Sequence, residues 1–135
     1  MSIQLSVSAR NGRLDSIEAS IGTSAILKIK TGAQPSDCAS ADTGTVLATL
    51  NLPSDYFSAA SSGEMEKTGT WEDASADDTG TAAHFRLYAS DGTTCHLQGS
   101  ISVISGGGDM ELGDISLTAG QAVLITTFTL TDGNP

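Results

Sequence analysis

The sequence predicts an all-β protein: an antiparallel β-sandwich of jelly-roll type with about seven or eight strands and a short N-terminal helix. Fifteen glycines and only 16% charged residues in a chain of 135 residues are typical of short strands joined by tight turns. Beyond the first helix, apolar residues recur with a period of two, as in half-buried strands. The length suits one domain, so we divide the chain into an N-terminal arm or helix, 1–22, and a single sandwich domain, 23–135.

A helix is predicted from Val7 to Ile21. Ser6 can cap its start, and Gly22 can supply the left-handed residue that ends it. Gly12 in the middle costs roughly 1 kcal/mol relative to alanine, so the helix needs a surface to pack against. That surface is either the domain's own sheet or a neighbouring subunit. The apolar stripe that would face it consists of Val7, Leu14, Ile17 and Ile21.

Strands of alternating polarity are predicted along the rest of the chain. In AILKIK, Leu27 and Ile29 share the core face, while Lys28 and Lys30 point away from it. The final strand is apolar on both faces, which indicates a central strand or an interface. The other strands are expected at 45–52 and 65–72, in the two arms of HFRLYASDGTTCHLQGSISVI, and in MELGDISL and QAVLITTFTLT.

The stretch HFRLYASDGTTCHLQGSISVI is predicted to form a hairpin. A three-residue loop at 90–92 would pair Leu87 with Cys95 and Phe85 with Leu97, which sets apolar residues opposite each other. A two-residue turn would instead pair apolar with polar residues, so we expect the three-residue loop. The other face, predicted to point outward, then carries His84, Arg86, Tyr88, Thr94, His96 and Gln98.

The tripeptide Asp-Thr-Gly occurs twice, at 42–44 and 78–80. Pepsin-like acid proteases use two such copies to bring two carboxylates to within about 3 Å. Here the flanking stretches PSDCASA and EDASAD are small and polar, whereas a catalytic Asp would follow a buried apolar strand. We interpret each copy as a turn in which Asp bonds nearby backbone and Gly takes a positive φ. Asp42 and Asp78 are therefore expected in solvent-accessible turns, too far apart to share a proton.

Metal and cofactor sites are not predicted. Cys95 and His96 are adjacent on a strand and face opposite sides, so without a bulge they cannot both bind one zinc ion. His84 and His96 could share an ion from one face, but such a site would be short of ligands. No catalytic constellation is recognisable either, and we expect no enzyme activity and no cofactor. The two cysteines allow one disulfide at most; in a cytosol both are expected as free, partly buried thiols, and whether they pair stays open.

The charge of the chain argues against nucleic acid as a partner, because its formal net charge is -10. Four of the six basic residues lie in the first thirty positions, which carry about +2, against about -12 for the remainder. Such a dipolar chain could dock with its basic end on an acidic surface, although chance is the alternative. The chain has no basic, apolar leader and no apolar run of membrane-spanning length, so we expect no membrane partner.

Three long stretches of the chain read AILKIKTGAQPSDCASADTGTVLATLNLPSDYF, GTWEDASADDTGTAAHFRLYASDGTTCHLQGSISV and ISLTAGQAVLITTFTLTDGN. They resemble the small structural proteins encoded among the virion genes of tailed bacteriophages and prophages. The resemblance covers nearly the whole chain and is one of pattern, not of a catalytic motif. Within that group the chain is most similar to head decoration, or cement, proteins, which are small β-sandwiches on the capsid.

The resemblance implies a non-enzymatic protein of the capsid surface, made in the host bacterial cytoplasm. Its implied partners are the major capsid protein and neighbouring copies of itself, with a homotrimer as one arrangement; many weak contacts would add up across the shell. The alternatives are a tail, baseplate or fibre component, or a carbohydrate-binding module with Trp71 and Tyr88 as sugar platforms. No residue-level site carries over. From the residues alone, the partner-contact candidates, each with core packing as the alternative, are Val7, Arg10, Arg13, Leu14, Ile17, Ile21, and an exposed Tyr56 and Phe57.

Overall fold

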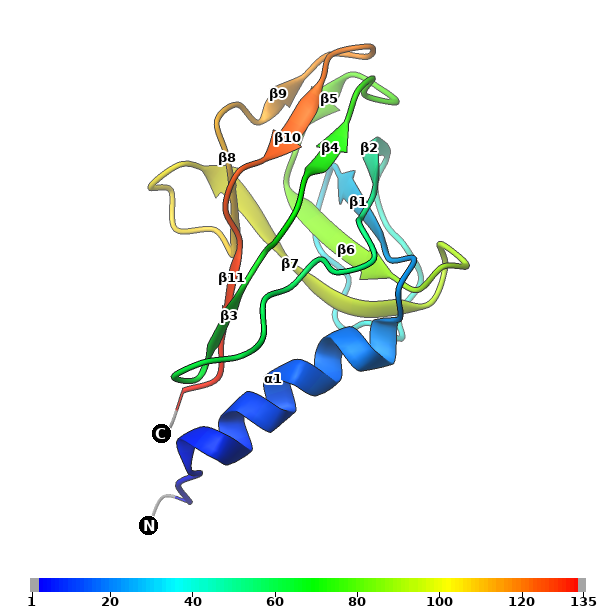
Figure 1. The fold of residues 1–135 in the computed structure, drawn as a ribbon. Coiled ribbons are helices and arrows are strands. Elements are labelled where there is room, and N and C mark those ends of the chain that lie inside the picture. The colour runs from blue at the N-terminus through cyan, green and yellow to red at the C-terminus, as the bar shows by residue number, and fades with distance from the viewer. Residues whose placement is uncertain (1–2, 134–135) are drawn as a thin grey trace.

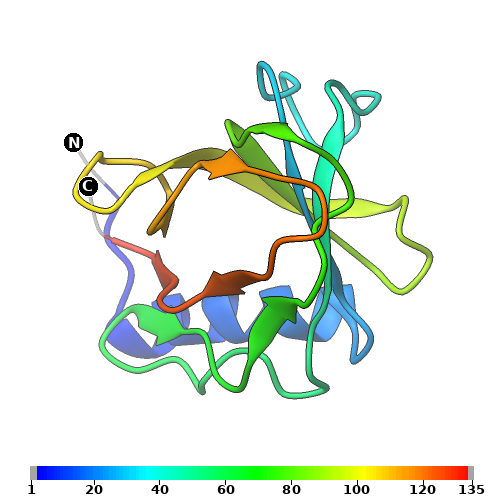
Figure 2. The same ribbon diagram turned by 90° about the horizontal axis from the view of Figure 1, so that it is seen from above.

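The structure is a computed structural model that describes residues 3–133, and within them it is mostly β with one helix, α1 (Val7–Ile21). The strands curl around a common interior, and α1 lies across one side of them (Figures 1 and 2). The largest sheet has the order β2-β1-β6-β7-β8. Its strands are β1 (Ile26–Lys30), β2 (Val46–Asn51), β6 (His84–Tyr88), β7 (Cys95–Val103) and β8 (Met110–Leu112).

Three two-stranded ladders close the rest of the structure. All three are antiparallel, as is the large sheet except where β8 joins β7 in parallel. The ladders pair β3 (Glu64–Glu66) with β11 (Thr129–Thr131), β4 (Trp71–Asp73) with β10 (Val123–Ile125), and β5 (Gly80–Thr81) with β9 (Ser116–Leu117).

This architecture confirms a mostly β fold with a short N-terminal helix, whereas the jelly-roll arrangement stays a prediction. The described part of the chain has eleven short strands in place of seven or eight. The strand predicted at 65–72 is divided into β3 and β4, and Gly69 between them has a φ of +71°. Both strands predicted at the end of the chain are likewise divided. Residues 1–2 and 134–135, at the ends of the two predicted segments, lie outside the described residues.

Helix α1 begins and ends at the predicted residues. The side chain of Ser6 accepts a hydrogen bond of 3.1 Å from the N–H of Ala9, which satisfies one free donor of the first turn. Gly22 has a φ of +94°, and its N–H donates to the carbonyl of Glu18 at 3.0 Å. Local sequence therefore determines both helix ends.

The apolar stripe of α1 packs mainly against the protein's own core. Leu14 and Ile21 are 4% and 3% exposed, and Ile17 is partly buried against the same cluster. Val7, in contrast, is 47% exposed. Of the two surfaces predicted for this stripe, the domain's own interior is the one observed for Leu14, Ile17 and Ile21, whereas Val7 in the first turn offers apolar surface to a neighbour.

Glu18 and Tyr56 fasten the C-terminal half of α1 to the body. One carboxylate oxygen of Glu18 accepts from the backbone N–H groups of Tyr56 and Phe57 at 3.2 and 2.8 Å. The hydroxyl of Tyr56 donates to the carbonyl of Gly22 at 2.8 Å. Burial, and secondarily the charge of Glu18, raise the pKa of Tyr56 to about 12, so its hydroxyl stays a donor.

The prediction that Tyr56 and Phe57 are exposed contact residues is wrong, because their exposed fractions are 0% and 2%. The ring centroid of Phe57 lies 5.6 Å from that of Trp71 and 6.2 Å from that of Phe128. Phe128 in turn lies 5.5 Å from Phe85 of β6. The segment that carries both residues is irregular and polar on either side, yet it turns these two rings into the core.

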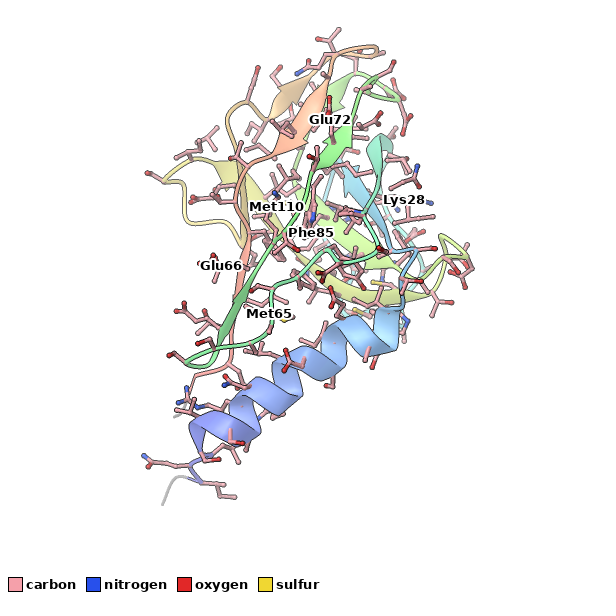
Figure 3. The ribbon with its side chains drawn as sticks, in the orientation of Figure 1. Lys28, Met65, Glu66, Glu72, Phe85 and Met110 are labelled. Carbon is pink, nitrogen blue, oxygen red and sulfur yellow. The ribbon has the colours of Figure 1, made fainter. Side chains whose placement is uncertain are left out.

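The core lies between the large sheet and the ladders. Phe85, Met65 and Met110, each 1% exposed, lie in this interior (Figure 3). Glu66 and Glu72 are exposed on the ladders that cover it. Residues from three different strands, β3, β6 and β8, thus bury their side chains together, as expected for one cooperative unit.

Substitution of Glu18 by alanine should lower the free energy of unfolding by about 1–3 kcal/mol, because two partly buried N–H groups lose their acceptor. Glu72→Ala is the matched control: it removes an exposed carboxylate and should change stability by no more than about 0.5 kcal/mol. Urea unfolding followed by tryptophan fluorescence measures both. Equal effects would contradict the role given to Glu18.

Candidate functional site

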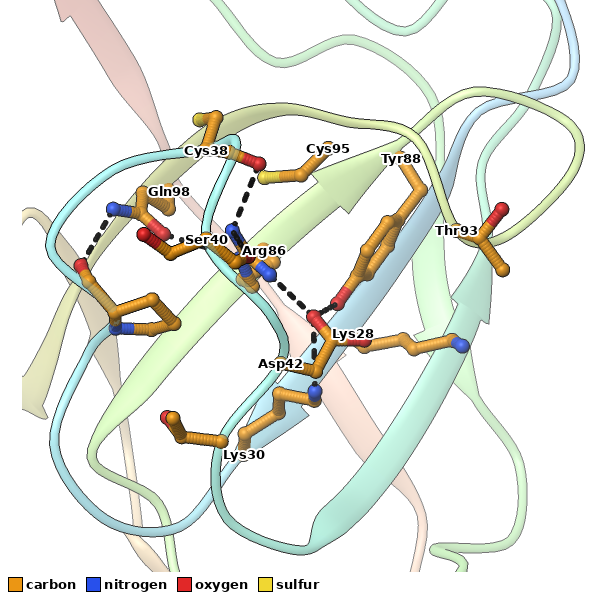
Figure 4. Close-up of polar contacts among 12 residues, drawn as sticks. Lys28, Lys30, Cys38, Ser40, Asp42, Arg86, Tyr88, Thr93, Cys95 and Gln98 are labelled. Atoms are coloured by element: carbon orange, nitrogen blue, oxygen red, sulfur yellow. Dashed lines mark hydrogen bonds and ion pairs between the residues drawn. The ribbon is translucent and has the colours of Figure 1, made fainter.

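The loop between β1 and β2, residues 31–45, crosses the face of the large sheet that points away from the core, and we call it the cover loop (Figure 4). This face was predicted to point outward, and that prediction is wrong for His84, Arg86 and Tyr88, whereas Thr94 and His96 are exposed as predicted. Beneath the cover loop Lys30 and Arg86 are each 2% exposed, His84 is 1% and Tyr88 is 0%. Sequence alternation assigned the side chains to the correct face but could not show that another segment lies over it.

The guanidinium group of Arg86 lies at the centre of this covered face. Its Nε donates to the side-chain oxygen of Gln98, the residue opposite in β7, at 3.1 Å. Its Nη1 forms a hydrogen-bonded ion pair with Asp42 of the cover loop. Its Nη2 donates to three cover-loop carbonyls, those of Asp37, Cys38 and Ser40, at 3.1–3.2 Å.

Asp42 connects three side chains of the sheet through one oxygen. Besides Arg86, its Oδ1 accepts from the hydroxyl of Tyr88 at 2.6 Å and lies 3.4 Å from Nζ of Lys30. Burial opposes ionisation of Asp42, but the hydrogen bonds from Tyr88 and Arg86 and the charge of Lys30 outweigh it and lower its pKa to about 2. Burial, and then the hydrogen bond to Asp42, raise the pKa of Tyr88. The carboxylate is therefore charged and the phenol neutral at neutral pH.

The first Asp-Thr-Gly tripeptide closes the neck of the cover loop. Gly44 has a φ of +74°, and a β-carbon there would collide with the carbonyl oxygen of Thr31. Thr43 donates from its hydroxyl to the carbonyl of Ala33 at 2.6 Å. The hydroxyl of Thr31 accepts from the N–H of Thr45 at 2.9 Å. These contacts set the position from which Asp42 reaches the sheet.

The second tripeptide has a different role. Asp78 is exposed and accepts from the N–H of Thr79 at 2.8 Å, and Thr79 accepts from the N–H of Ala119 at 3.0 Å. Gly80 lies within β5 and, unlike Gly44, has no positive φ. The prediction of accessible positions is confirmed for both aspartates, since the side chain of Asp42 is 43% exposed. The prediction that both copies form the same kind of turn is not confirmed, because Asp42 pairs with buried cations and not with its own backbone.

His84 lies at the edge of the covered face. Its Nδ1 is 2.9 Å from the carbonyl of Gly32, which makes Nδ1 the protonated nitrogen of the neutral ring. Burial lowers the pKa of His84, and the charges of Lys30 and Arg86 act in the same direction. Its Nε2 has no hydrogen-bond partner within residues 3–133, and within the same range no group of three or more His, Cys, Asp or Glu is arranged to hold a metal ion.

The basic residues predicted as partner contacts are bound within the protein. Nη1 of Arg10 donates to the carbonyl of Asp132 at 3.0 Å, and Nε of Arg13 lies 3.1 Å from the carboxylate of the same residue. Arg13 also lines a groove of about 430 Å³ between α1 and β11, together with Leu14, Ile17, Leu130 and Thr131. The structure therefore brings three of the predicted contacts to one groove and removes Tyr56 and Phe57 from the surface.

Sequence reasoning missed the cover-loop network, although a signal for it exists. Lys28 lies directly opposite Arg86, and Lys30 lies opposite His84. Like charges in directly opposed positions destabilise a sheet unless acceptors neutralise them. The like-charged pair of Lys28 and Arg86, with Lys30 on the same face, therefore requires a covering segment that supplies carboxylate or carbonyl oxygens, which PSDCASAD provides.

The proposed sugar platforms are not available on the surface. Trp71 and Tyr88 are both 0% exposed, and Trp71 donates its indole N–H to the carbonyl of Thr68 at 3.1 Å. Stacking on a sugar ring would require either side chain to leave the interior. Across residues 3–133, no helix has the length and apolar character needed to cross a membrane.

Comparison with known proteins found no match to this chain. No protein-family model matches the chain, and neither a curated protein nor a solved structure matches it significantly. The geometry of the cover loop and of the α1 groove is therefore what a function must be argued from.

The two tripeptides offer a matched pair of substitutions. Asp42→Asn should lower the free energy of unfolding by about 2–3 kcal/mol, because Arg86 and Lys30 lose the carboxylate with which they form ion pairs; the loss is below that of a fully buried pair since the side chain of Asp42 is 43% exposed. Asp78→Asn changes an exposed turn and should cost no more than about 1 kcal/mol. Chemical denaturation compares the two, and a larger effect at Asp78 would contradict the network.

The contribution of Asp42 should depend on pH in a defined direction. Its pKa is lowered from 3.8 to about 2 on folding, so the stability it contributes is fully present above about pH 5 and is lost as the pH falls through about 4 to 2. The stability difference between the wild type and Asp42→Asn should therefore shrink over that interval, and subtracting the two curves cancels the carboxyls that both proteins share. A difference that stays constant down to about pH 2 would show that Asp42 is not held ionised.

Proposed function

We propose that the protein is a non-enzymatic structural protein of a tailed-bacteriophage virion, most like a capsid decoration or cement protein that binds the major capsid protein lattice. The observation that carries this proposal is that the covered polar side chains serve to hold a loop. Asp42, Arg86 and Tyr88 are the groups best suited to chemistry, and each is bonded to another member of the network. The jelly-roll sandwich is the fold we propose with it, the ladders forming its second layer.

The cover loop has the properties of a prepared binding surface. Its outer residues, such as Gln34, Ala39 and Ala41, are small or polar and exposed, while its backbone is fixed from below by Arg86 and at the neck by Gly44. A loop that is ordered before binding loses little conformational entropy when a partner contacts it. Small contact areas of this kind become effective when they are repeated over a lattice.

A second surface lies at the N-terminal end of α1. Ile3 is 81% exposed and Val7 is 47% exposed, which leaves two large apolar side chains in water close to the start of the helix. Burying them against a capsid subunit or a neighbouring copy would be favourable. Together with the cover loop, this surface gives the protein two separate contact surfaces, as bridging between two subunits requires. Val7 therefore remains among the partner-contact candidates.

Binding to capsids tests the proposal directly. The purified chain should co-sediment with assembled capsids of the phage or prophage that encodes it, bind separated capsid subunits far more weakly, and raise the temperature at which the shells disrupt. Ala39→Arg at the exposed face of the cover loop should weaken binding by about tenfold or more. Ala119→Arg, at an equally exposed turn remote in sequence, is the control and should bind like the wild type.

Other outcomes of the capsid-binding experiment would contradict the decoration role or favour another virion component. Failure to bind any form of the capsid would contradict the decoration role, and binding to tails or baseplates in its place would favour a tail component. Equal loss of binding in Ala39→Arg and Ala119→Arg, with both variants folded, would contradict the cover loop as the contact surface. Labelling of intact particles with an antibody to the chain provides an independent location.

A further inference from the structure

Two cysteines from distant parts of the chain meet at the edge of the covered face. Cys38 belongs to the cover loop, and its carbonyl accepts from Arg86 at 3.1 Å. Cys95 begins β7 and pairs with Tyr88 across the irregularity that follows Leu87. The side chains of Cys38 and Cys95 interact with each other, and Figure 4 shows them next to each other above the guanidinium group.

We propose that Cys38 and Cys95 are a redox modification site, at which a disulfide fastens the cover loop to β7. Both thiols are free in the structure, and both side chains are partly exposed, so a small oxidant can reach them. One thiol lies on the cover loop and the other on the sheet beneath it. A covalent bond between them therefore joins the two layers that Arg86 and Asp42 otherwise hold together by hydrogen bonds and charge.

The oxidant we propose is a small disulfide such as oxidised glutathione. The thiolate of one cysteine attacks a sulfur of that disulfide, which breaks its S–S bond, forms a mixed disulfide and releases one glutathione thiolate. The thiolate of the second cysteine then attacks the protein sulfur of the mixed disulfide and releases the second glutathione. In total Cys38 and Cys95 lose two protons and two electrons, and one glutathione disulfide is reduced to two thiols.

The environment of Cys95 makes this reaction slow at neutral pH. Burial, followed by the adjacent thiol of Cys38, raises the pKa of Cys95 to about 11. Because only the thiolate attacks, closure through Cys95 should accelerate as the pH rises. The site therefore behaves as one that is oxidised gradually and then persists, and not as a fast catalytic dithiol.

The test uses the full chain incubated with oxidised or reduced glutathione. Oxidation should lower the mass by about two units, for two hydrogen atoms, and remove both thiols from a titration in denaturant. Non-reducing peptide mapping should show Cys38 linked to Cys95. Because the bond closes a long loop of the unfolded chain, the midpoint of thermal unfolding should rise by about 5–10 °C, and a reductant should reverse the rise.

Two sets of variants make the test specific. Cys38→Ser and Cys95→Ser should each abolish both the link and the thermal shift. In Asp42→Asn, which loosens the same loop, oxidation should raise the unfolding midpoint more than in the wild type, because the two constraints act on one element.

The proposal is overturned if oxidation gives only mixed disulfides with glutathione, or dimers linked between chains. It is also overturned if the link forms without any change in the unfolding midpoint, since the bond would then fail to fasten the loop. Failure of a serine variant to fold does not remove the test, because peptide mapping and the reversible thermal shift of the wild-type chain decide it alone. Neither readout requires capsids, so the result is separate from that of the proposed function.

Discussion

The burial of Arg86 is the constraint that determines the conformation of the cover loop and its position on the large sheet. A guanidinium group withdrawn from water costs several kcal/mol unless its donors and its charge are matched. Here a glutamine, a carboxylate and three carbonyls match them, and four of these five acceptors belong to the cover loop. Since those acceptors must converge on one planar group, the loop has little freedom to adopt another conformation.

These hydrogen bonds and charges order a loop that has too little apolar surface to be ordered by burial. The cover loop contains no large apolar side chain, and Pro35 is its one buried residue. In the other half of the molecule the same task is done by rings: Tyr56 and Phe57 draw an equally irregular segment into the core. The protein thus fixes one loop by hydrogen bonds and charge, and another by burial of aromatic rings.

Features that depend on residues close together in the sequence could be predicted, whereas features that depend on distant segments could not. The ends of α1 follow from Ser6 and Gly22, which act within one turn, and they were predicted correctly. The hairpin register was wrong: Leu87 pairs with Leu97 and not with Cys95. The turn is one residue longer than predicted, since the N–H of Ala89 bonds to the carbonyl of Thr94, and an irregularity between Leu87 and Tyr88 adds a second residue. The burial of Phe57 and Arg86 depends on segments tens of residues away, and no local pattern reveals which segment covers which face.

The position of the cover loop does not depend on the identity of most of its side chains. Arg86 binds it through backbone carbonyls, which every residue type possesses, whereas Asp42, Gly44 and the hydroxyl groups at the neck of the loop are required by their chemical identity. Exposed positions such as Gln34, Ala39 and Ala41 can therefore change while the loop keeps its course. Such a loop can acquire new specificities by simple exchange of residues, and foreign peptide segments could be grafted between two fixed points of a rigid frame.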